Sequence, residues 1–374
     1  MYTFFDLHMP TRILFEAGAA RTVGTHIPGS SVLIMADPFL LSSGVAGAIG
    51  DTLTDKRVAY FDGIEPNPSC ESIDEAAQVA REMGADCVIG LGGGSVMDAA
   101  KMVACLAGES GSIYDYYQLG QKGLQKRRVG LILIPTTAGT GSEVTNVGVF
   151  TSRRTGKKLP MASQEFWADL ALLDPELTYS MPGSLTAATG MDAFTHAIEA
   201  YWNLQSNPIS SALAQSAIKM ILQNIKVAYD QPGNQEARAQ MLMASTMAGI
   251  AFSQTKTTGI HALSYPFTMF NGVPHGVGCA LTLPVFIRLS VQRQREKMQH
   301  LVDFLGFDSV EALADHVHDL MAGMNLPLKL SEVGVTRGDF EKIAESALSM
   351  TVMIERTPAQ MDKASIMAVL EELA

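Results

Sequence analysis

Residues 87–101 read CVIGLGGGSVMDAAK, in which an apolar run, three glycines and a helical pattern follow one another directly. A short apolar run that ends in a glycine turn is typical of a buried strand in a parallel sheet. Successive glycines let backbone N–H groups approach an anion closely, and the N-terminus of a following helix adds the positive end of its dipole. This stretch therefore predicts an α/β fold with a phosphate-binding turn after one of its strands.

A structural alternative explains the same residues. Ser95 and Asp98 match the S-x-x-D capping box of a helix that would begin near Val96. The glycines match neither G-x-G-x-x-G nor the P-loop pattern, the two arrangements most specific for nucleotide phosphates. Taken by itself, the segment is compatible with a phosphate-binding turn and with a well-capped helix start.

Other apolar runs extend the α/β prediction to about residue 180, because they alternate with helical patterns. These runs are VLIMA at 32–36, RVAYF at 57–61, GLILI at 130–134 and DLALLD at 169–174. The helix before the first quoted stretch is predicted over 71–83, and VFTSRRTGKKL at 149–159 is predicted to form a hairpin. We therefore expect a parallel sheet in this half of the chain.

Beyond Pro182 the strand signals fade, and segments rich in Ala, Leu, Met and Ile predict helices. These segments span 185–202, 209–229, 235–253, 297–304, 309–323 and 338–349. The sequence thus predicts an N-terminal α/β nucleotide-binding domain over residues 1–181 and an all-α metal-binding domain over residues 182–374. A cleft between two such domains is a common place for a ligand.

The composition is that of a globular chain of 374 residues, with 47% hydrophobic and 17% charged residues. A net charge of −11 without a block of like charges argues against binding to nucleic acid or to an anionic membrane. No apolar run reaches the roughly 18 residues of a spanning helix, and the first residues lack the pattern of a secretion signal. With four cysteines and no CxxC spacing, we expect a cytoplasmic protein with reduced thiols.

A second turn rich in glycine and hydroxyl groups, TTAGTGSEVT at 136–145, follows the apolar run at 130–134. Both turns therefore follow strands, at the edge where open α/β sheets bind ligands, although a Thr-rich loop can also hydrogen-bond only to itself. Asp37 follows the first run and is placed to accept ribose hydroxyls and repel a 2′-phosphate, which favours NAD over NADP. An Asp before Pro is also a common turn former.

In the predicted helical half, GMDAFTHAIEAYW at 190–202 places Asp192 and His196 four residues apart, on one face of a helix. His261 and His275 flank a turn-containing segment further along the chain. One carboxylate and three imidazoles form a ligand set that suits Fe²⁺ or Zn²⁺. The alternative is that Asp192 caps the helix and His196 is a packed, hydrogen-bonded core residue.

Several stretches resemble, in order and spacing, the iron-containing (group III) alcohol dehydrogenase family over about residues 10 to 290. They are GGGSVMDAAK, IPTTAGTGSEVT, LLDPELT, TGMDAFTHAIEAYW and PHG. The resemblance implies a homodimer in which hydride passes between NAD(H) and a small alcohol or aldehyde. It also implies Fe²⁺, with Zn²⁺ as the alternative, held by Asp192, His196, His261 and His275. The implied NAD contacts are Asp37, Asn67, Gly93, Gly94, Ser95, Asp98, Thr136, Thr137, Thr145 and Lys158. From the residues alone, Lys158 is a solvated turn charge.

Two residues near His261 bear on the substrate. The family has a second histidine four positions after this one, where Tyr265 stands here; a phenol can still hold and donate a proton. Lys256 belongs to a K-T-x-x-x-HALSYPFT pattern, which is similar to the subgroup that reduces small acidic aldehydes such as phosphonoacetaldehyde. A buried ammonium beside a metal suggests an anionic substrate group, whereas the alternative is that Lys256 reaches solvent or pairs with an internal carboxylate.

Two further departures from the family concern Glu16, where a glycine is usual, and MIERTPAQ at 353–360, which lacks the usual Asn-Pro-Arg. Two other functions stay open at this point: an NAD- and metal-dependent lyase or cyclase similar to dehydroquinate synthase, and a non-catalytic nucleotide-binding protein. Such synthases need several basic residues around a polyanionic substrate, and the sequence shows only Lys256 near the proposed ligands.

Overall fold

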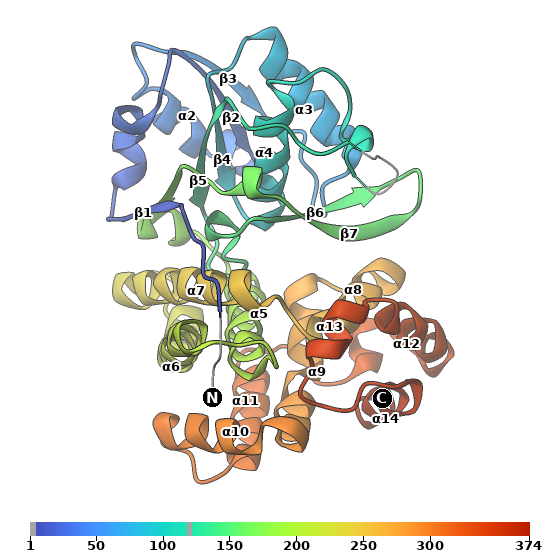
Figure 1. Cartoon of the computed structure of the whole chain (residues 1–374). Helices are drawn as coiled ribbons and strands as arrows, with labels where there is room; N and C mark the ends of the chain where they lie inside the picture. Colours follow the sequence, from blue (N-terminus) through green and yellow to red (C-terminus); the bar gives the residue numbers. More distant parts are fainter. Residues whose placement is uncertain (1–4, 118–121) are drawn as a thin grey trace. The chain divides into compact units, whose positions relative to one another are not determined.

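The computed structural model describes residues 5–117 and 122–374, which divide into two compact units. The α/β unit holds His8–Thr137 and Gly141–Thr178. The helical unit holds residues 5–7, Ala138–Thr140 and Tyr179–Ala374. In Figure 1 the sheet lies in the blue-to-green part of the chain, and the long helices lie in the yellow-to-red part.

The α/β unit is built on a six-stranded sheet in the order β1-β8-β5-β4-β2-β3, and all neighbouring strands are parallel. Its strands are β1 (Arg12–Phe15), β2 (Ser31–Ala36), β3 (Arg57–Phe61), β4 (Cys87–Gly92), β5 (Gly130–Pro135) and β8 (Leu170–Leu173). β6 (Val147–Ser152) and β7 (Lys157–Ala162) form a separate antiparallel hairpin. The predicted parallel sheet is confirmed, and β1 is a strand that the sequence analysis did not predict.

Both faces of this sheet are covered, which explains why its strands read as continuous apolar runs. On β2, Leu33 and Met35 join the core that α3 (Cys70–Glu82) and α4 (Gly94–Leu106) cover. Val32 and Ile34 point to the opposite face and join the core beneath α1 (Pro38–Ser42) and α2 (Val45–Gly50). Figure 1 shows α3 and α4 on one side of the sheet and α2 on the other.

The start of α4 differs from the prediction. The helix begins at Gly94 with Gly93 as its N-cap, so Ser95 does not cap it and the capping-box interpretation is wrong. The extended backbone of Gly93, with φ −78° and ψ −173°, leads into the helix two residues earlier than expected. The Ser95 hydroxyl instead accepts a hydrogen bond from the backbone N–H of Asn67 at 3.2 Å.

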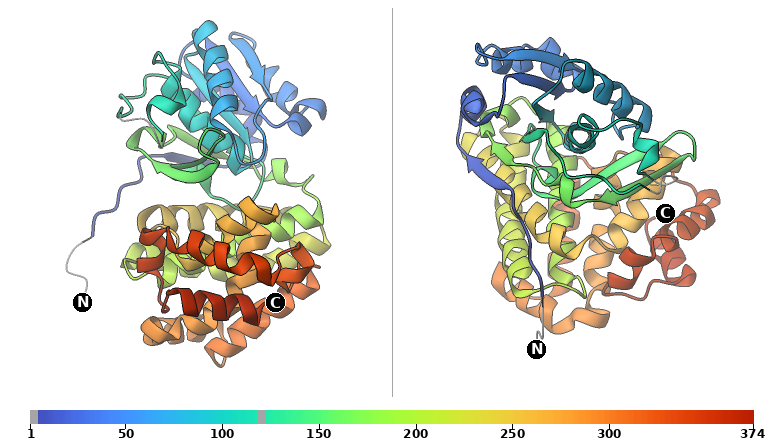
Figure 2. Two further views of the ribbon diagram at one scale, coloured as in Figure 1. Left: turned by 90° about the vertical axis from the view of Figure 1, so that its right-hand side faces the viewer. Right: turned by 45° about the horizontal axis from the view of Figure 1, so that its top comes forward.

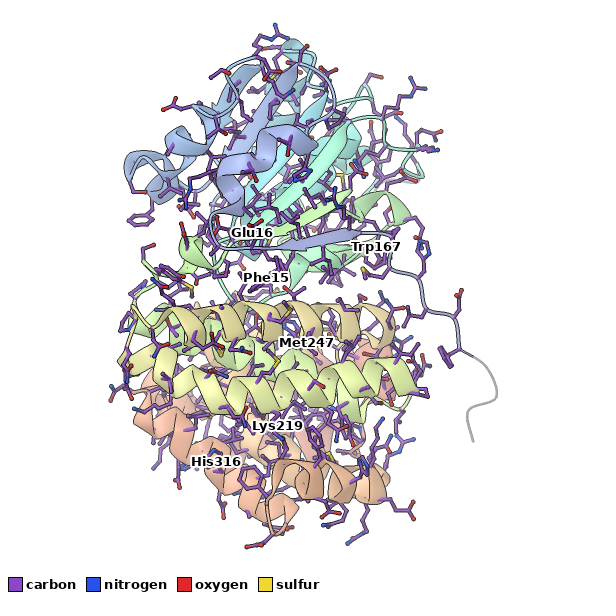
Figure 3. All side chains as sticks on the ribbon, turned by 90° about the vertical axis from the view of Figure 1, so that its left-hand side faces the viewer. Phe15, Glu16, Trp167, Lys219, Met247 and His316 are labelled. Atoms are coloured by element: carbon purple, nitrogen blue, oxygen red, sulfur yellow. The ribbon has the colours of Figure 1, made fainter. Side chains whose placement is uncertain are left out.

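Glu16 stands directly after β1, at a position where the family resemblance led us to expect glycine. Glu16 follows Phe15 directly (Figure 3), and its backbone N–H donates to the Leu173 carbonyl at 3.1 Å. Its side chain is exposed. The substitution of the usual glycine is therefore compatible with the pairing of β1 and β8.

The helical unit contains ten α-helices among the described residues. They are α5 (Gly183–Trp202), α6 (Pro208–Asp230), α7 (Gln235–Thr255), α8 (Gly259–Asn271), α9 (His275–Leu289), α10 (Val291–Leu305), α11 (Val310–Gly323), α12 (Phe340–Leu348), α13 (Thr351–Arg356) and α14 (Lys363–Glu372). α5 packs against α6, α7 and α9, and α8 contacts α9, α12 and α13. Figures 1 and 2 show α12, α13 and α14 gathered together within this unit.

Short 3-10 helices complete the secondary structure. They are Ala19–His26, Ile113–Asp115, Ser142–Val144, Gln164–Phe166, Pro175–Thr178, Leu330–Val333 and Arg337–Asp339.

His261 and His275 flank a turn at residues 272–274, as the sequence predicted, but the helices on either side of this turn were not predicted. His261 lies inside α8, and His275 is the first residue of α9. Pro266 and Pro284 lie inside these helices, and residues 277–287 of α9 are all buried, so neither the composition nor a polar-apolar period revealed them.

Gly90 allows the close packing of β4 against α4. A Cβ at this position would lie 2.8 Å from both the Ala100 Cβ and the Leu133 Cδ2. We expect Gly90→Ala to lower the free energy of unfolding by about 1–3 kcal/mol, because the core would be overpacked. As a control, Gly47→Ala places its Cβ in open space within α2 and should stabilise by about 0.5–1 kcal/mol. Chemical denaturation measures both, and equal effects would contradict the packing argument.

Candidate functional site

The four residues predicted to bind a metal lie on three helices of the helical unit. Asp192 and His196 come from α5, His261 from α8 and His275 from α9. The Asp192 Oδ1 lies 3.8 Å from the His196 Nδ1 and 3.7 Å from the Nε2 atoms of both His261 and His275. These distances are too long for hydrogen bonds, but they suit atoms that each lie about 2.1 Å from one shared ion.

Three of these facing atoms have no hydrogen-bond partner although they are buried: the Asp192 Oδ1, the His196 Nδ1 and the His261 Nε2. Buried polar atoms are rarely left unsatisfied, and leaving a carboxylate oxygen so is costly. A divalent cation among them would satisfy all three at once. The residues present therefore fit the metal that the sequence predicted.

The electrostatics favour the protonation states that a metal needs at Asp192 and His196, whereas the charges of Cys279 and Glu199 raise the pKa of His261, which must lose a proton to bind a cation. Burial lowers the pKa of His196 to about 4, so this imidazole is neutral near pH 7. The pKa of Asp192 also lies below its usual range: burial raises it, and attraction to His196 and His275 outweighs that effect. An ionised carboxylate beside a neutral imidazole is the state in which both bind a cation.

Glu199, which the sequence analysis missed, holds one of the proposed ligands in place. Its fully buried carboxylate accepts a hydrogen bond from the His261 Nδ1 at 2.6 Å. It also accepts from the backbone N–H and hydroxyl of Thr258 and from the backbone N–H of Ile260. A proton fixed on Nδ1 leaves the Nε2 of His261 free to bind a metal. Glu199 lies seven residues after Asp192, on the same helical face, which is the signal that would have revealed it.

Cys279 is a second residue that the sequence analysis missed. Its buried Sγ lies 3.9 Å from the His275 Nε2, one helical turn further along α9. Donor atoms of Asp192, His261, His275 and Cys279 all lie within 4.8 Å of one another. The i,i+4 spacing to His275 is the sequence signal for this position.

Of the two residues predicted to act on the substrate, Tyr265 packs against two of the proposed ligands, whereas Lys256 is linked to a third only through Phe252 and its ammonium donates to the Ser253 carbonyl at 3.2 Å. The ring of Tyr265 stacks against His275, with 5.6 Å between the centroids, and meets the edge of His261 at 6.4 Å. Lys256 ends α7, and its backbone N–H donates to the carbonyl of Phe252 at 2.7 Å. The Phe252 ring in turn stacks on His196 at 4.3 Å.

In the α/β unit, the predicted cofactor residues gather at the carboxyl ends of neighbouring strands. Asp37 follows β2, Gly93 and Gly94 follow β4, and Thr136 follows β5. The chain leaves β2 toward β3 and leaves β4 toward β5, so the direction of the strand order changes between β2 and β4. Open α/β sheets bind their ligands at such a switch point. The Asp37 carboxylate also caps α1, as the turn-forming alternative expected, by accepting from the Leu40 N–H at 3.0 Å.

Contacts between loops bring further predicted residues together. Asn67, with φ at 61°, accepts a hydrogen bond from the Lys158 Nζ at 2.7 Å and contacts Ser95 through its backbone N–H. Lys158 is a buried residue of β7, so its interpretation as a solvated turn charge is wrong. The Thr137 hydroxyl lies beside Gly93, 3.5 Å from where a Cβ would stand.

Asp98 and Thr145 belong to a network around Lys101, a fully buried residue that the sequence analysis did not single out. The Lys101 Nζ donates to the Ser142 hydroxyl at 2.6 Å, to the Thr145 hydroxyl at 3.0 Å and to the Val147 carbonyl at 2.7 Å. Asp98 accepts from Ser142 and from the Val149 N–H. These contacts attach the second turn to α4.

Two family models match the chain. The model described as iron-containing alcohol dehydrogenase matches residues 10–175, and the model described as the C-terminal part of the Fe-containing alcohol dehydrogenase family matches residues 186–374. The chain belongs to the iron-containing alcohol dehydrogenase family. The resemblance seen in the sequence is thereby confirmed, and so is its class, oxidoreductases of alcohols and aldehydes.

Individual relatives cover nearly the whole of this alcohol dehydrogenase. Long-chain-alcohol dehydrogenase 1 of Geobacillus thermodenitrificans is 35% identical over 351 residues, which cover 91% of this chain and 88% of the relative. Sulfoacetaldehyde reductase of Bilophila wadsworthia is 32% identical over 375 residues, which cover 96% of this chain and 96% of the relative. The crystal structure of sulfoacetaldehyde reductase from Bifidobacterium kashiwanohense in complex with NAD⁺ superimposes with a TM-score of 0.95 at 33% identity, covering 100% of this chain and 99% of that one.

Glu199→Gln tests how the His261 ring is held in this iron-containing alcohol dehydrogenase. The amide keeps the size of the side chain but weakens the hydrogen bond to Nδ1, so metal affinity should fall about 10- to 100-fold. Metal content after dialysis against graded concentrations of chelator measures the loss. The exposed Glu296→Gln is the matched control. Equal retention of metal by both variants would contradict this role.

Gly276→Ala tests the close approach of α9 to α5. A Cβ there would lie 2.2 Å from the Ala188 carbonyl oxygen, so a helix backbone beside two proposed metal ligands must shift. We expect a loss of about 1–3 kcal/mol in unfolding free energy, together with reduced metal binding. Gly278→Ala is the control, since its Cβ would meet nothing closer than 3.5 Å. Thermal unfolding and metal analysis of both variants decide, and normal metal content in Gly276→Ala would refute the argument.

Proposed function

We propose that this dehydrogenase uses NAD(H) to interconvert a small aldehyde and its alcohol, with Fe²⁺ or Zn²⁺ bound by Asp192, His196, His261 and His275. The proposal rests on three buried polar atoms of this site that have no hydrogen-bond partner: the Asp192 Oδ1, the His196 Nδ1 and the His261 Nε2. Family membership supports the reaction class. The names of relatives such as 1,3-propanediol dehydrogenase and sulfoacetaldehyde reductase support small substrates.

The chain's own residues would bind, orient and exchange a proton. When bound, the metal supplies Lewis acidity toward a carbonyl oxygen and NADH supplies the hydride. Glu199 keeps the His261 Nε2 directed toward Asp192. The Tyr265 hydroxyl, whose ring lies against His275, is our candidate for holding the proton that the reduced oxygen takes up.

For the cofactor, we propose that Gly93, Gly94 and Ser95 bind the pyrophosphate at the N-terminus of α4. Asp37 would accept the ribose hydroxyls and disfavour a 2′-phosphate, which selects NAD. Further contacts are proposed for Asn67, Asp98, Thr136, Thr137, Thr145 and Lys158. The NAD⁺ complex of the solved relative supports this choice of cofactor.

For the substrate, we propose an anionic group recognised by Lys256. Burial lowers the pKa of this lysine, and the charge of Arg356 lowers it further. An ammonium in such surroundings is stabilised by an anion. Two of the relatives are named for sulfoacetaldehyde, an aldehyde with an anionic group.

The domain limits 1–181 and 182–374, a homodimeric assembly and a cytoplasmic location also stay proposals, based on the sequence pattern and the family resemblance. Within the described residues, no helix combines the length and the apolar character required to cross a membrane.

The test is NADH consumption by protein loaded separately with Fe²⁺ and with Zn²⁺, using a panel of neutral and anionic aldehydes. We expect turnover with at least one metal, a preference for NADH over NADPH, and activity lost by about 1,000-fold or more in His261→Ala, since one transition-state interaction of several kcal/mol is removed. Circular dichroism checks that His261→Ala is folded. An active variant without bound metal, or inactive wild-type protein with every metal and aldehyde, would refute the proposal.

A further inference from the structure

Cys279 lies on the same face of α9 as His275, the first residue of that helix. The two residues are four positions apart, so their side chains project in the same direction. The Cys279 Sγ is fully buried and lies 3.9 Å from the His275 Nε2. The other cysteines of the chain, Cys70, Cys87 and Cys105, belong to the α/β unit, so Cys279 supplies the sulfur of a thiol to the helical unit.

Hydrogen bonds determine which nitrogen of His275 faces this sulfur with its lone pair. The Ser264 hydroxyl has a single proton, which it donates to the His261 carbonyl at 3.0 Å. The Ser264 oxygen also lies 3.3 Å from the His275 Nδ1, so this nitrogen is the donor of the second hydrogen bond. A neutral imidazole carries only one N–H, and its lone pair is therefore on Nε2, the atom beside the Cys279 sulfur.

Two other predicted ligands present their donor atoms to the same place. His261 directs its Nε2 there, because Glu199 accepts a hydrogen bond from its Nδ1 at 2.6 Å. The Asp192 Oδ1 lies 3.7 Å from the Nε2 atoms of both His261 and His275. Donor atoms of these three ligands and of Cys279 all lie within 4.8 Å of one another. Ligand atoms lie about 2.0–2.3 Å from Zn²⁺, so two on opposite sides of it are about 4–5 Å apart. The four donors therefore fit around a single ion.

A bound cation would change what the Cys279 thiol can contact. The His275 Nε2 has one lone pair, and when that lone pair binds a cation it can no longer accept a hydrogen bond from the thiol. The sulfur would then lie in buried surroundings beside a divalent cation. A thiol in this position loses its proton, because the cation stabilises the thiolate directly. The contact between Cys279 and His275 thus leads to a metal–sulfur bond once the site is loaded.

We propose that Cys279 is a metal ligand in addition to those predicted from the sequence, and that its sulfur makes the site select Zn²⁺ over Fe²⁺. This inference rests on the proposed function, because it concerns the same metal site. Thiolate is a soft ligand that favours Zn²⁺, whereas carboxylate and imidazole bind both metals. A cysteine that only filled space beside His275 would leave the choice between the two metals unaffected.

The experiment loads the protein with Co²⁺ under anaerobic, reducing conditions and records its absorption spectrum. A thiolate bound to Co²⁺ gives an intense sulfur-to-metal charge-transfer absorption in the near ultraviolet, which nitrogen and oxygen ligands do not give. Cys279→Ser replaces the sulfur by a hydroxyl and keeps the shape of the side chain. Cys105→Ser is the matched control, because Cys105 is also a buried cysteine on a helix but belongs to the α/β unit.

We expect the charge-transfer absorption in wild-type protein and in Cys105→Ser, and its absence in Cys279→Ser that still binds Co²⁺. A second readout is the metal content after equilibration with Zn²⁺ and Fe²⁺ together in a chelator buffer. The preference for Zn²⁺ over Fe²⁺ should fall by about 10-fold or more in Cys279→Ser, since loss of a hydrogen-bond partner behind a ligand already lowers metal affinity about 10- to 100-fold. Cys105→Ser should keep the wild-type preference.

Wild-type protein that binds Co²⁺ without the charge-transfer absorption would overturn the role of Cys279 and leave the proposed function intact. The same absorption in Cys279→Ser would also overturn it, and an unchanged preference for Zn²⁺ in this variant would overturn the selectivity. If Cys279→Ser does not fold, the spectra of wild-type protein and Cys105→Ser decide. Wild-type protein that binds none of the three metals would instead refute the proposed function and this inference with it.

Discussion

The helical unit is organised around a buried carboxylate oxygen that faces three imidazoles. Asp192 is 3% exposed, and its Oδ1 has no hydrogen-bond partner, so without a cation this arrangement would be strongly unfavourable. Much of the unit serves to bring the ligands together. α5 is covered by α6, α7 and α9, and Gly276 allows α9 to approach the backbone of α5 closely. Glu199 then fixes the ring of the ligand that α8 supplies.

The α/β unit also buries a charged group, but here the group is a cation. Lys101 is a fully buried ammonium, and it is satisfied by two hydroxyls, a carbonyl and the Asp98 carboxylate at 3.5 Å. This network joins α4 to the loop after β5, so two glycine-rich turns that follow neighbouring strands are held at one edge of the sheet. Buried charges thus hold the two glycine-rich turns in one unit and the proposed metal ligands in the other.

Two places where the chain varies from the usual pattern of the family lie at the proposed metal site or beside Lys256. Tyr265 replaces a histidine of the family and packs against His275, where a phenol retains a hydroxyl for proton exchange. The segment MIERTPAQ lacks the usual Asn-Pro-Arg, yet it supplies Arg356 to the backbone before Lys256. Arg356 is thus a second basic residue beside Lys256, and the lyase alternative required several such residues. Family membership nevertheless assigns the chain to the alcohol dehydrogenases.

The sequence by itself determined the parallel sheet, because buried strands produce continuous apolar runs, and the pairing of Asp192 with His196, because four residues span one helical turn. It missed β1, which is short, and α8 and α9, whose internal prolines and long buried stretches remove the usual helical signals. Only the tertiary structure decided that Arg356 meets the carbonyl of Thr255, that the Nδ1 of His261 meets Glu199 and that Lys101 meets Ser142 and Thr145 of the second turn. Periodicity reports how one segment buries its own surface, whereas these contacts join residues whose meeting depends on how helices and loops pack, and no local pattern encodes that.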